Sequence, residues 1–230
     1  MRKPLVVTID GPAGSGKTVC GRLAALQLGY QFLSSGIYYR AVTYEALRSG
    51  VDLQDEEALA ALASSVKITL KNEPEGLRVE INGEDCTEAL KQEKVTAGVR
   101  YVAEKPAVRS AVNEVLRRFA EKHTVVAEGR DMGSVVFPAA DCKFYLEASR
   151  ECRVERRRRE LEALGVHVEP EALRRSIEER DQRDKTRPIS PLVVPQGAEV
   201  IDTTDLTVDQ VVERIVRRVY EKQREKAERS

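Results

Sequence analysis

The residues whose types and spacing most clearly indicate a chemical function lie near the start of the chain, in the stretch GPAGSGKT at positions 11–18. This stretch fits the pattern GxxxxGK[ST]. It follows the apolar run LVVTI and precedes a helical pattern that Gly29 closes. Its glycines let the backbone curl until consecutive N–H groups point at phosphate oxygens, and the next helix adds the dipole of its N-terminus. The pattern therefore predicts a loop that binds the phosphates of a nucleoside triphosphate.

Two side chains of this loop carry the expected chemistry. Lys17 can reach the β- and γ-phosphates, and the Thr18 hydroxyl can bind Mg²⁺, so we expect Mg²⁺ with ATP as the cofactor. A purely structural glycine turn is the alternative, and the strand-then-helix context disfavours it. The predicted ATP-binding residues of the loop are Gly11, Pro12, Ala13, Gly14, Ser15, Gly16, Lys17 and Thr18.

Short apolar runs alternate with helical patterns along the chain. This order is typical of an α/β fold in which helices cover both faces of a parallel sheet. The last helix has a clear start, because Thr207 and Gln210 have capping-box spacing and an apolar stripe follows. The tail after Tyr220 lacks the stripe, so we expect it to fray. The five predicted strands are 5–9, 31–34, 124–127, 143–146 and 199–202.

Two segments interrupt this alternation. Residues 66–83 alternate apolar with polar side chains on either side of KNEPEG, which predicts an inserted β-hairpin. Residues 149–187 are helical and highly charged, with Ser149 as a plausible N-cap, and are a candidate lid. We expect a single domain over 1–230, with the hairpin inside an acceptor-binding region at about 35–110.

Composition excludes several classes of function. The 230-residue chain has 38 Lys plus Arg and 38 Asp plus Glu, so no net basic charge favours nucleic acid or a membrane as partner. No apolar stretch approaches the roughly 20 residues of a membrane span, and no signal peptide is evident, so we expect a cytoplasmic protein. The four cysteines lack metal-ligand spacing and are expected to be reduced thiols.

Three classes of phosphate-loop protein remain to be compared. A GTPase switch needs the guanine-reading sequence NKxD, and no NK dipeptide occurs in the chain. An ATPase would use hydrolysis to move a protein partner, and a small-molecule kinase would hold an acceptor beside the loop. Arginines after several predicted strands favour the kinase, since a phosphate-bearing acceptor needs cations that converge from different segments. These are Arg40, Arg109, Arg130, Arg180, Arg183 and Arg187.

The segment ERDQRDKTR has a more specific arrangement. The spacings of four and three place Arg180, Asp184 and Arg187 on one helical face, where the aspartate can orient both arginines or bond a sugar hydroxyl. Taken singly, each arginine is better explained as an ordinary surface charge or ion pair, and only the joint pattern favours the kinase. The run Arg156 to Arg159 faces all round its helix and is expected to be mostly solvated, offset by Glu155, Glu160 and Glu162.

Over nearly its whole length, the chain resembles the bacterial cytidylate kinases among the nucleoside monophosphate kinases. The stretches that carry the likeness, in family order, are IDGPAGSGKT, SGIYYRA, VAEKPAVR, EGRDMGSVVFP, KFYLEAS and ERDQRDKTRPISPL. The resemblance implies a P-loop kinase fold with a five-stranded parallel sheet flanked by helices, a β-hairpin insert and a helical lid. It also implies a monomer that transfers the γ-phosphoryl group of ATP to CMP, and to dCMP, in pyrimidine nucleotide metabolism.

The resemblance also implies a role for each matching residue. It puts Arg40, Arg130 and Arg187 on the CMP phosphate, Arg180 and Asp184 near the ribose, and Arg109 with Asp131 at the base. Ser35 belongs to the same acceptor set, and Arg153 and Arg157 would lie over the ATP phosphates. Lys17, Arg130, Asp184 and Arg187 would act in catalysis. Two positions depart from the family pattern: Ser34 stands where Asp is common, and Arg100 where some members have a base-contacting Ser.

The charged sequence EGRD, at the end of a predicted buried strand, fits the same interpretation. Glu128 ends the strand like a Walker-B acid and is expected to hold Mg²⁺ through water. The alternative is an ion pair between Glu128 and Arg130 that caps the sheet. The acceptor's phosphate oxygen is already ionised, so no general base is needed. Two other functions stay open: a kinase for UMP or another small acceptor, and an ATPase that acts on a protein.

Overall fold

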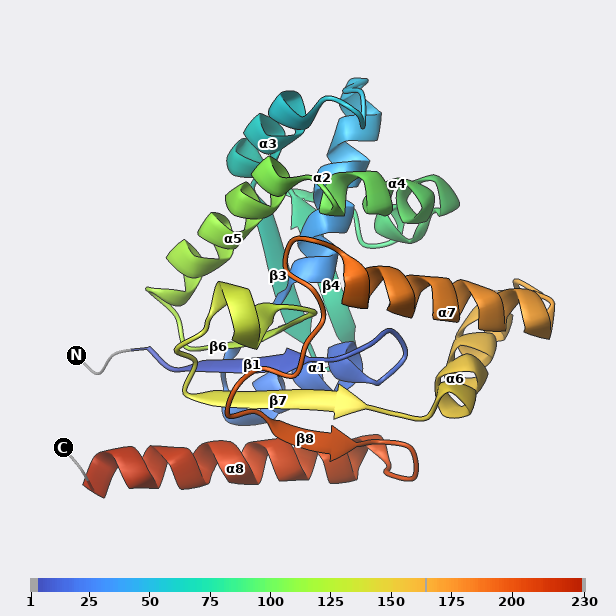
Figure 1. Ribbon diagram of the computed structural model, residues 1–230. Coiled ribbons are helices and arrows are strands. Elements are labelled where there is room, and N and C mark those ends of the chain that lie inside the picture. Colours follow the sequence, from blue (N-terminus) through green and yellow to red (C-terminus); the bar gives the residue numbers. More distant parts are fainter. Residues whose placement is uncertain (1–3, 164, 229–230) are drawn as a thin grey trace. The chain divides into compact units, whose positions relative to one another are not determined.

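The computed structural model describes residues 4–163 and 165–228 (Figure 1). The α-helices and strands, in chain order, are β1 (Val6–Asp10), α1 (Lys17–Leu28), β2 (Gln31–Ser34), α2 (Ser35–Ser49), α3 (Glu56–Ser65), β3 (Ile68–Glu73), β4 (Gly76–Ile81), β5 (Glu84–Asp85), α4 (Glu93–Ala103), α5 (Pro106–Ala120), β6 (Val125–Gly129), β7 (Cys142–Glu147), α6 (Arg150–Ala163), α7 (Pro170–Thr186), β8 (Glu199–Asp202) and α8 (Val208–Glu228). Two short helices complete the list: the 3₁₀ turn η1 (Ala89–Lys91) and the π-helical turn η2 (Met132–Val136).

A five-stranded parallel sheet with the strand order β2-β6-β1-β7-β8 forms the centre of the α/β fold. All five predicted strands are confirmed, each within a few residues of its predicted ends. The apolar residues of β1 and β6 are almost entirely buried, as expected for strands covered on both faces. Strand β7 pairs in parallel with β1 on one side and with β8 on the other.

The inserted hairpin is also confirmed, with a turn shorter than the predicted loop KNEPEG, since β3 ends at Glu73 and β4 begins at Gly76. β3 and β4 pair in antiparallel register from Ile68 opposite Ile81 to Glu73 opposite Gly76, and the short β5 adds a third strand. Val79 and Ile81 are buried, whereas the residues between and around them are more exposed. This alternation is the pattern of a sheet with one covered face.

The chain divides into two compact units, which are described separately. The first comprises residues 4–6 and Ala25–Ala127, and it holds α2 to α5 and the hairpin sheet. The second comprises Val7–Ala24 and residues 128–228, and it holds the phosphate loop, α6, α7 and α8. The residues predicted to bind ATP therefore all belong to the second unit.

The C-terminal helix α8 packs against β7 in the second unit (Figure 1). The predicted capping box is present, since Thr207 N donates to Gln210 Oε1 at 2.9 Å and Gln210 N donates to Thr207 Oγ1 at 3.3 Å. The expected fraying is wrong as far as Glu228, where the helix ends. Ion pairs within the tail replace the missing apolar stripe, among them Lys222 with Glu225 at 2.6 Å.

The cysteines are free thiols, as the sequence predicts. Cys20, Cys86 and Cys142 are buried, and Cys152 on α6 is partly exposed. Burial raises the pKa of Cys20 and of Cys142 to about 11, so both thiols stay protonated and unreactive near neutral pH. In the part of the chain that the structure describes, no helix is long and apolar enough to span a membrane.

Candidate functional site

The phosphate loop lies between β1 and α1, and its glycines are required by the space around them. A Cβ atom on Gly11 would lie 2.0 Å from the carbonyl oxygen of Leu146, which leaves room for glycine alone. Gly14 has φ of +76°, and a Cβ atom there would lie 3.1 Å from Cβ of Arg153. The loop is thus pressed against β7 and α6, so its course depends on residues far away in sequence.

Lys17 is folded back onto its own loop. Its Nζ donates to the Pro12 carbonyl oxygen at 2.6 Å and lies 3.5 Å from Ser15 Oγ. Burial, reinforced by the positive charges of Arg130 and Arg180, holds the pKa of Lys17 well below its usual value, while Glu128 opposes this shift. A buried cation among other cations favours the arrival of an anion, which is what a triphosphate provides.

Asp10, at the end of β1, holds the turn that follows β6. Its Oδ1 accepts from Met132 N at 2.8 Å and its Oδ2 from Gly133 N at 2.7 Å, and the side chain is fully buried. Burial raises the pKa of Asp10 to about 6, although the two backbone hydrogen bonds favour the ionised form. This contact fixes η2, directly after Arg130 and Asp131.

Arg130 pairs with Asp184, whose Oδ2 lies 2.7 Å from Nε of the arginine. Both side chains are only 18% exposed. Asp131 is buried, and its Oδ1 lies 4.0 Å from Nη2 of Arg187. The second unit therefore brings together four of the acceptor residues predicted from the sequence, and Arg180 contributes its charge to both Lys17 and Asp184.

The prediction that Arg187 shares a helical face with Asp184 is wrong. Helix α7 ends at Thr186, and Arg187 is its C-cap with φ of −58° and ψ of 138°. Pro188 explains this ending, since the residue before a proline is driven from the helical region into extended backbone. Arg187 Nε then donates to the carbonyl oxygen of Ser190, which keeps the guanidinium close to Asp131.

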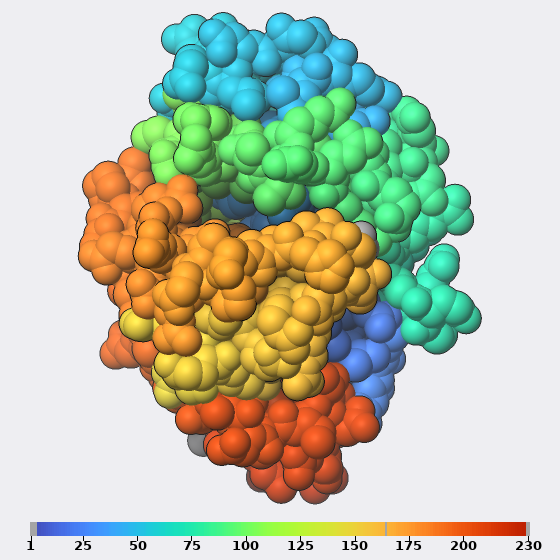
Figure 2. All heavy atoms as spheres, turned by 90° about the vertical axis from the view of Figure 1, so that its right-hand side faces the viewer, coloured from blue at the N-terminus to red at the C-terminus, as the bar shows by residue number. Residues whose placement is uncertain are grey.

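Helices α6 and α7 lie at the surface of the molecule (Figure 2). Some arginines of α6 face the phosphate loop and others face solvent. Arg153 is buried, donates to the carbonyl oxygens of Ala13 and Ala148, and pairs with Asp181 at 2.7 Å. Arg157 instead pairs with Glu160 at 2.9 Å on the exposed side of the helix. Of the two predicted lid arginines, the structure therefore brings only Arg153 to the phosphate loop.

Arg156 is a site residue that the sequence analysis missed. It was expected to be mostly solvated, but its guanidinium contacts the carbonyl oxygen of Gly14 and two oxygens of Thr203. Its neighbours behave as expected, because Arg158 and Arg159 both pair with Glu155. A run of four arginines gives no sign of which one faces inward; only the packing of α6 against the loop distinguishes Arg156.

The first unit holds the other predicted acceptor residues. Arg40 on α2 donates from Nη1 to the carbonyl oxygen of Leu90 at 3.0 Å and to Thr96 Oγ1 at 2.9 Å. Arg109 on α5 is 3% exposed, donates to the Ala103 carbonyl oxygen at 2.9 Å and lies 5.3 Å from the ring centroid of Tyr39. Both guanidinium groups are thus oriented by polar or aromatic partners of α2, α4 and η1.

The two departures from the family pattern have visible partners. Ser34 is the N-cap of α2 and accepts from Ile37 N at 3.3 Å, a task that serine and aspartate perform about equally well. Arg100 stacks on the ring of Tyr101, with its guanidinium carbon 4.5 Å from the ring centroid, and it also bonds the tyrosine hydroxyl. Ser35, the first residue of α2, is buried.

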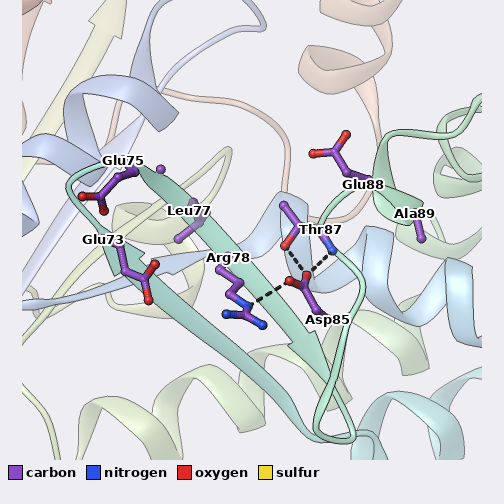
Figure 3. Close-up of a pocket in the computed structure, with 9 residues that line it drawn as sticks. Glu73, Glu75, Leu77, Arg78, Asp85, Thr87, Glu88 and Ala89 are labelled. Carbon is purple, nitrogen blue, oxygen red and sulfur yellow. Dashed lines mark hydrogen bonds and ion pairs between the residues drawn. The ribbon is translucent and has the colours of Figure 1, made fainter.

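A separate depression lies on the hairpin sheet (Figure 3), and it contains no predicted site residue. Three of its residues contact one another: Asp85 accepts from Thr87 N and Oγ1, and its Oδ2 lies 2.9 Å from Nε of Arg78. These contacts stabilise the turn after β5. We therefore assign these residues a structural role and do not regard the depression as a site of chemistry.

A family model and similar named proteins indicate the same family. The family model described as Cytidylate kinase matches residues 7–221. Proteins named cytidylate kinase are 44% identical in Pelotomaculum thermopropionicum, over 89% of this chain and 91% of that one, and 43% identical in Vibrio cholerae, over 90% and 92%. A solved structure of an uncharacterized protein from Eubacterium ventriosum has a TM-score of 0.52 at 11% identity, covering 94% of this chain and 98% of its own, which supports the fold alone.

Proposed function

The chain belongs to the cytidylate kinase family, and we propose that its phosphate loop and arginine cluster transfer the γ-phosphoryl group of ATP to CMP. The observation that carries the proposal is the grouping of Arg130, Asp131, Asp184 and Arg187 in the same unit as Lys17. An ATPase has no need of a second, carboxylate-ordered set of cations next to its phosphate loop. A monophosphate acceptor does.

In this proposal the chain's residues act by placement and charge compensation. Lys17 leaves the Pro12 carbonyl and neutralises the β- and γ-phosphates, and the buried carboxylate of Asp10 keeps η2 in position behind Arg130. Arg130 and Arg187 then hold the acceptor phosphate, whose ionised oxygen is the nucleophile. Charge that spreads over the transferred group meets guanidinium donors that are already oriented, which is the largest source of rate in such reactions.

The remaining acceptor roles are proposed from the family resemblance. Asp184 and Arg180 would bind the ribose, and Asp131 with Arg109 would bind the base. Ser35 and Arg40 complete the set, with Arg40 on the acceptor phosphate. The burial of Asp131 and Arg109 supports a role in reading the base, because a buried polar group discriminates strongly when a ligand fails to satisfy it. We include dCMP as a second acceptor.

The donor set suits Mg²⁺, which prefers oxygen ligands. Glu128 is 4% exposed, and its charge opposes the lowering of the Lys17 pKa, so the carboxylate lies close to the loop. Thr18 adds a hydroxyl at the start of α1. We propose that Thr18 binds the ion directly and Glu128 through water. When bound, Mg²⁺ supplies charge neutralisation at the triphosphate oxygens.

We further propose that residues 149–187 act as a lid over the bound nucleotides, and that the protein works as a monomer in the cytoplasm. The resemblance motivates the oligomeric state and the location. The lid is motivated by its composition, because α6 has Arg153 as its one buried residue and α7 has Leu173 and Ile177, among the described residues of these helices. Few apolar contacts hold these helices in place, and it is the polar contacts of Arg153 and Arg156 that fasten α6 to the phosphate loop.

A coupled assay of ADP formation tests the acceptor. ATP is supplied with CMP, dCMP, UMP, AMP or no acceptor, and the expected order has CMP first, with dCMP close behind. Equal turnover without any acceptor would favour the ATPase, and a clear preference for UMP would replace CMP as the substrate. The Asp131→Asn variant provides a second comparison, since it alters the proposed base contact without altering the phosphate loop.

A further inference from the structure

The four peptide groups from Pro12 to Gly16 each have a carbonyl oxygen held by a side chain. Lys17 Nζ and Ser15 Oγ donate to the oxygen of Pro12, and Arg153 Nη1 donates to that of Ala13 at 3.2 Å. Arg156 Nη1 lies 3.3 Å from the oxygen of Gly14. Thr203 Oγ1 lies 3.2 Å from the oxygen of Ser15 and 3.0 Å from that of Glu147, so its one O–H is shared between these two acceptors. The contacts form an uninterrupted series along the loop.

Arg156 and Thr203 are joined to each other as well as to the loop. Arg156 Nη1 donates to Thr203 Oγ1 at 3.0 Å, and Nη2 donates to the Thr203 carbonyl oxygen at 2.6 Å. Thr203 is 2% exposed, and its N–H donates to the carbonyl oxygen of Glu147 at 2.8 Å. Thr203, the residue after β8, is therefore bound to the end of β7, and the guanidinium of Arg156 is bound to Thr203.

Because the peptide group is planar, these contacts with carbonyl oxygens also determine where the neighbouring N–H groups point. Within one trans peptide the C=O and the following N–H are fixed in a plane and point in opposite directions. A side chain that holds the oxygen of Gly14 therefore fixes the direction of the Ser15 N–H, and one that holds the oxygen of Ser15 fixes that of Gly16. These N–H groups are the donors that a phosphate loop offers to its ligand.

We propose that Arg156 and Thr203 are positioning residues that orient the N–H donors of Ser15 and Gly16 before the triphosphate binds. The proposal rests on the loop being the triphosphate site, as the proposed function has it, and adds two residues that act from the side opposite the ligand. Such orientation removes part of the ordering that binding would otherwise require.

The partners of Arg156 distinguish this role from an ordinary ion pair. Arg157, Arg158 and Arg159 all contact glutamates, whereas the three hydrogen bonds of Arg156 go to neutral oxygens of the loop and of Thr203. A guanidinium can donate in two directions at once with fixed geometry, which a lysine ammonium cannot reproduce. Arg159, 73% exposed and three residues further along α6, is a matched control.

The test is calorimetric binding of inorganic tripolyphosphate and of ATP to the full chain. We expect Thr203→Val and Arg156→Lys to weaken both ligands by the same factor, about 5- to 10-fold, the scale of one lost hydrogen bond. Thr203→Ser, which keeps the hydroxyl, and Arg159→Lys should stay within about twofold of wild type. The KM for CMP should not change in any variant.

A double variant provides the second measurement. Because both residues act through one contact network, Arg156→Lys combined with Thr203→Val should weaken tripolyphosphate binding little more than either change alone. Should Thr203→Val fail to fold by circular dichroism, the Arg156→Lys and Thr203→Ser comparisons still decide. Unchanged tripolyphosphate binding, a loss confined to ATP, or equal losses in Thr203→Ser and Thr203→Val would each overturn the proposal. Tripolyphosphate carries no nucleoside and needs no acceptor, so an error in the acceptor assignment would leave these binding results unaltered.

Discussion

Nε of Arg130 lies 2.7 Å from Oδ2 of Asp184, and this pair connects the turn after β6 to the C-terminal part of α7 across 54 residues of sequence. Burial alone would raise the pKa of Asp184, but the charge and hydrogen bond of Arg130, together with the charges of Arg180 and Arg187, outweigh it, so the pKa is lowered. The carboxylate is thus ionised near neutral pH and keeps Arg130 in one orientation. An arriving phosphate meets an arginine that is already placed.

We expect Asp184→Asn to lower the free energy of unfolding by about 2–4 kcal/mol at pH 7, because the change leaves the Arg130 charge partly buried without its carboxylate. Since the folded pKa of Asp184 lies below 3.8, its contribution is complete above that value and is lost as the pH falls through the folded pKa. Urea unfolding at pH 7 and at pH 2.5 measures this difference, which should shrink at the lower pH. Equal stability of both proteins at pH 7 would contradict the structural role of the pair.

Replacing Lys17 with Met should separate activity from stability. Turnover should fall by about 10²- to 10³-fold, as when other preorganised charges are removed, while the melting temperature of the nucleotide-free protein should rise. The rise follows because burial and the neighbouring arginines disfavour the lysine's charge. Steady-state kinetics and calorimetry check both effects, with the exposed Lys185→Met as control. Activity within a few-fold of wild type would remove Lys17 from catalysis.

Asp10 should make the stability of the protein depend on pH. Its pKa rises from 3.8 in the unfolded chain to about 6 in the folded one, so the folded protein binds this proton more tightly. The resulting stabilisation is complete below about pH 4 and is lost as the pH rises through 6. Asp10→Asn cannot titrate, so its stability relative to wild type should increase by about 2–3 kcal/mol between pH 4 and pH 7. Chemical unfolding across this range tests it, with exposed Asp205→Asn as control; parallel curves for wild type and Asp10→Asn would refute the assignment.

Asp131 should discriminate cytosine from uracil. A carboxylate accepts from the exocyclic amino group of cytosine, whereas uracil presents a carbonyl oxygen there, and Asp131 is too buried for water to compensate easily. We expect Asp131→Asn to lower kcat/KM for CMP by a factor that corresponds to about 1–3 kcal/mol of lost transition-state stabilisation. The value of kcat/KM for UMP should fall less, or rise. Equal losses for both nucleotides would mean that Asp131 orients Arg187 instead, and Arg100 would be the next residue to vary.

Helices α6 and α7 should exchange their amide hydrogens faster than α8 without nucleotide. Five buried side chains, Val211, Val212, Ile215, Val216 and Val219, anchor α8, whereas the described residues of α6 and α7 bury far fewer. A bisubstrate mimic should slow exchange in α6 and α7 and leave α8 unchanged. Equal protection of α6 and α7 with and without the mimic would refute the lid.

Much of the fold was predictable because its signals are local. The runs that form β1 and β6 are apolar at nearly every position, and the capping box of α8 lies within four residues. The hairpin could be predicted from alternation alone. The helical tail after Tyr220 was not, because an apolar stripe is no guide to a helix held by ion pairs such as Lys222 with Glu225, and the pair of Lys226 with Asp141 joins residues 85 positions apart. Sequence patterns do not reveal contacts of that range.

The candidate site was predictable where residue type determines the role. The phosphate loop needs its glycines and Lys17 in a fixed order, and a motif records that order. Arg156 and Arg157 are adjacent and chemically identical, yet one contacts Gly14 and the other Glu160. The rotation of α6 decides between them, and that rotation is set by packing against the loop rather than by any local pattern. Asp181, which pairs with Arg153, was missed for the same reason.

The uneven burial of the four thiols makes Cys152 an attachment point that needs no engineering. A maleimide reagent should modify this partly exposed side chain of α6 first, because Cys20, Cys86 and Cys142 are buried and burial raises the pKa of Cys20 and Cys142 to about 11. A fluorophore or spin label would then report directly from the segment expected to close. The labelled protein, with no residue substituted, could therefore be followed through its catalytic cycle by time-resolved spectroscopy.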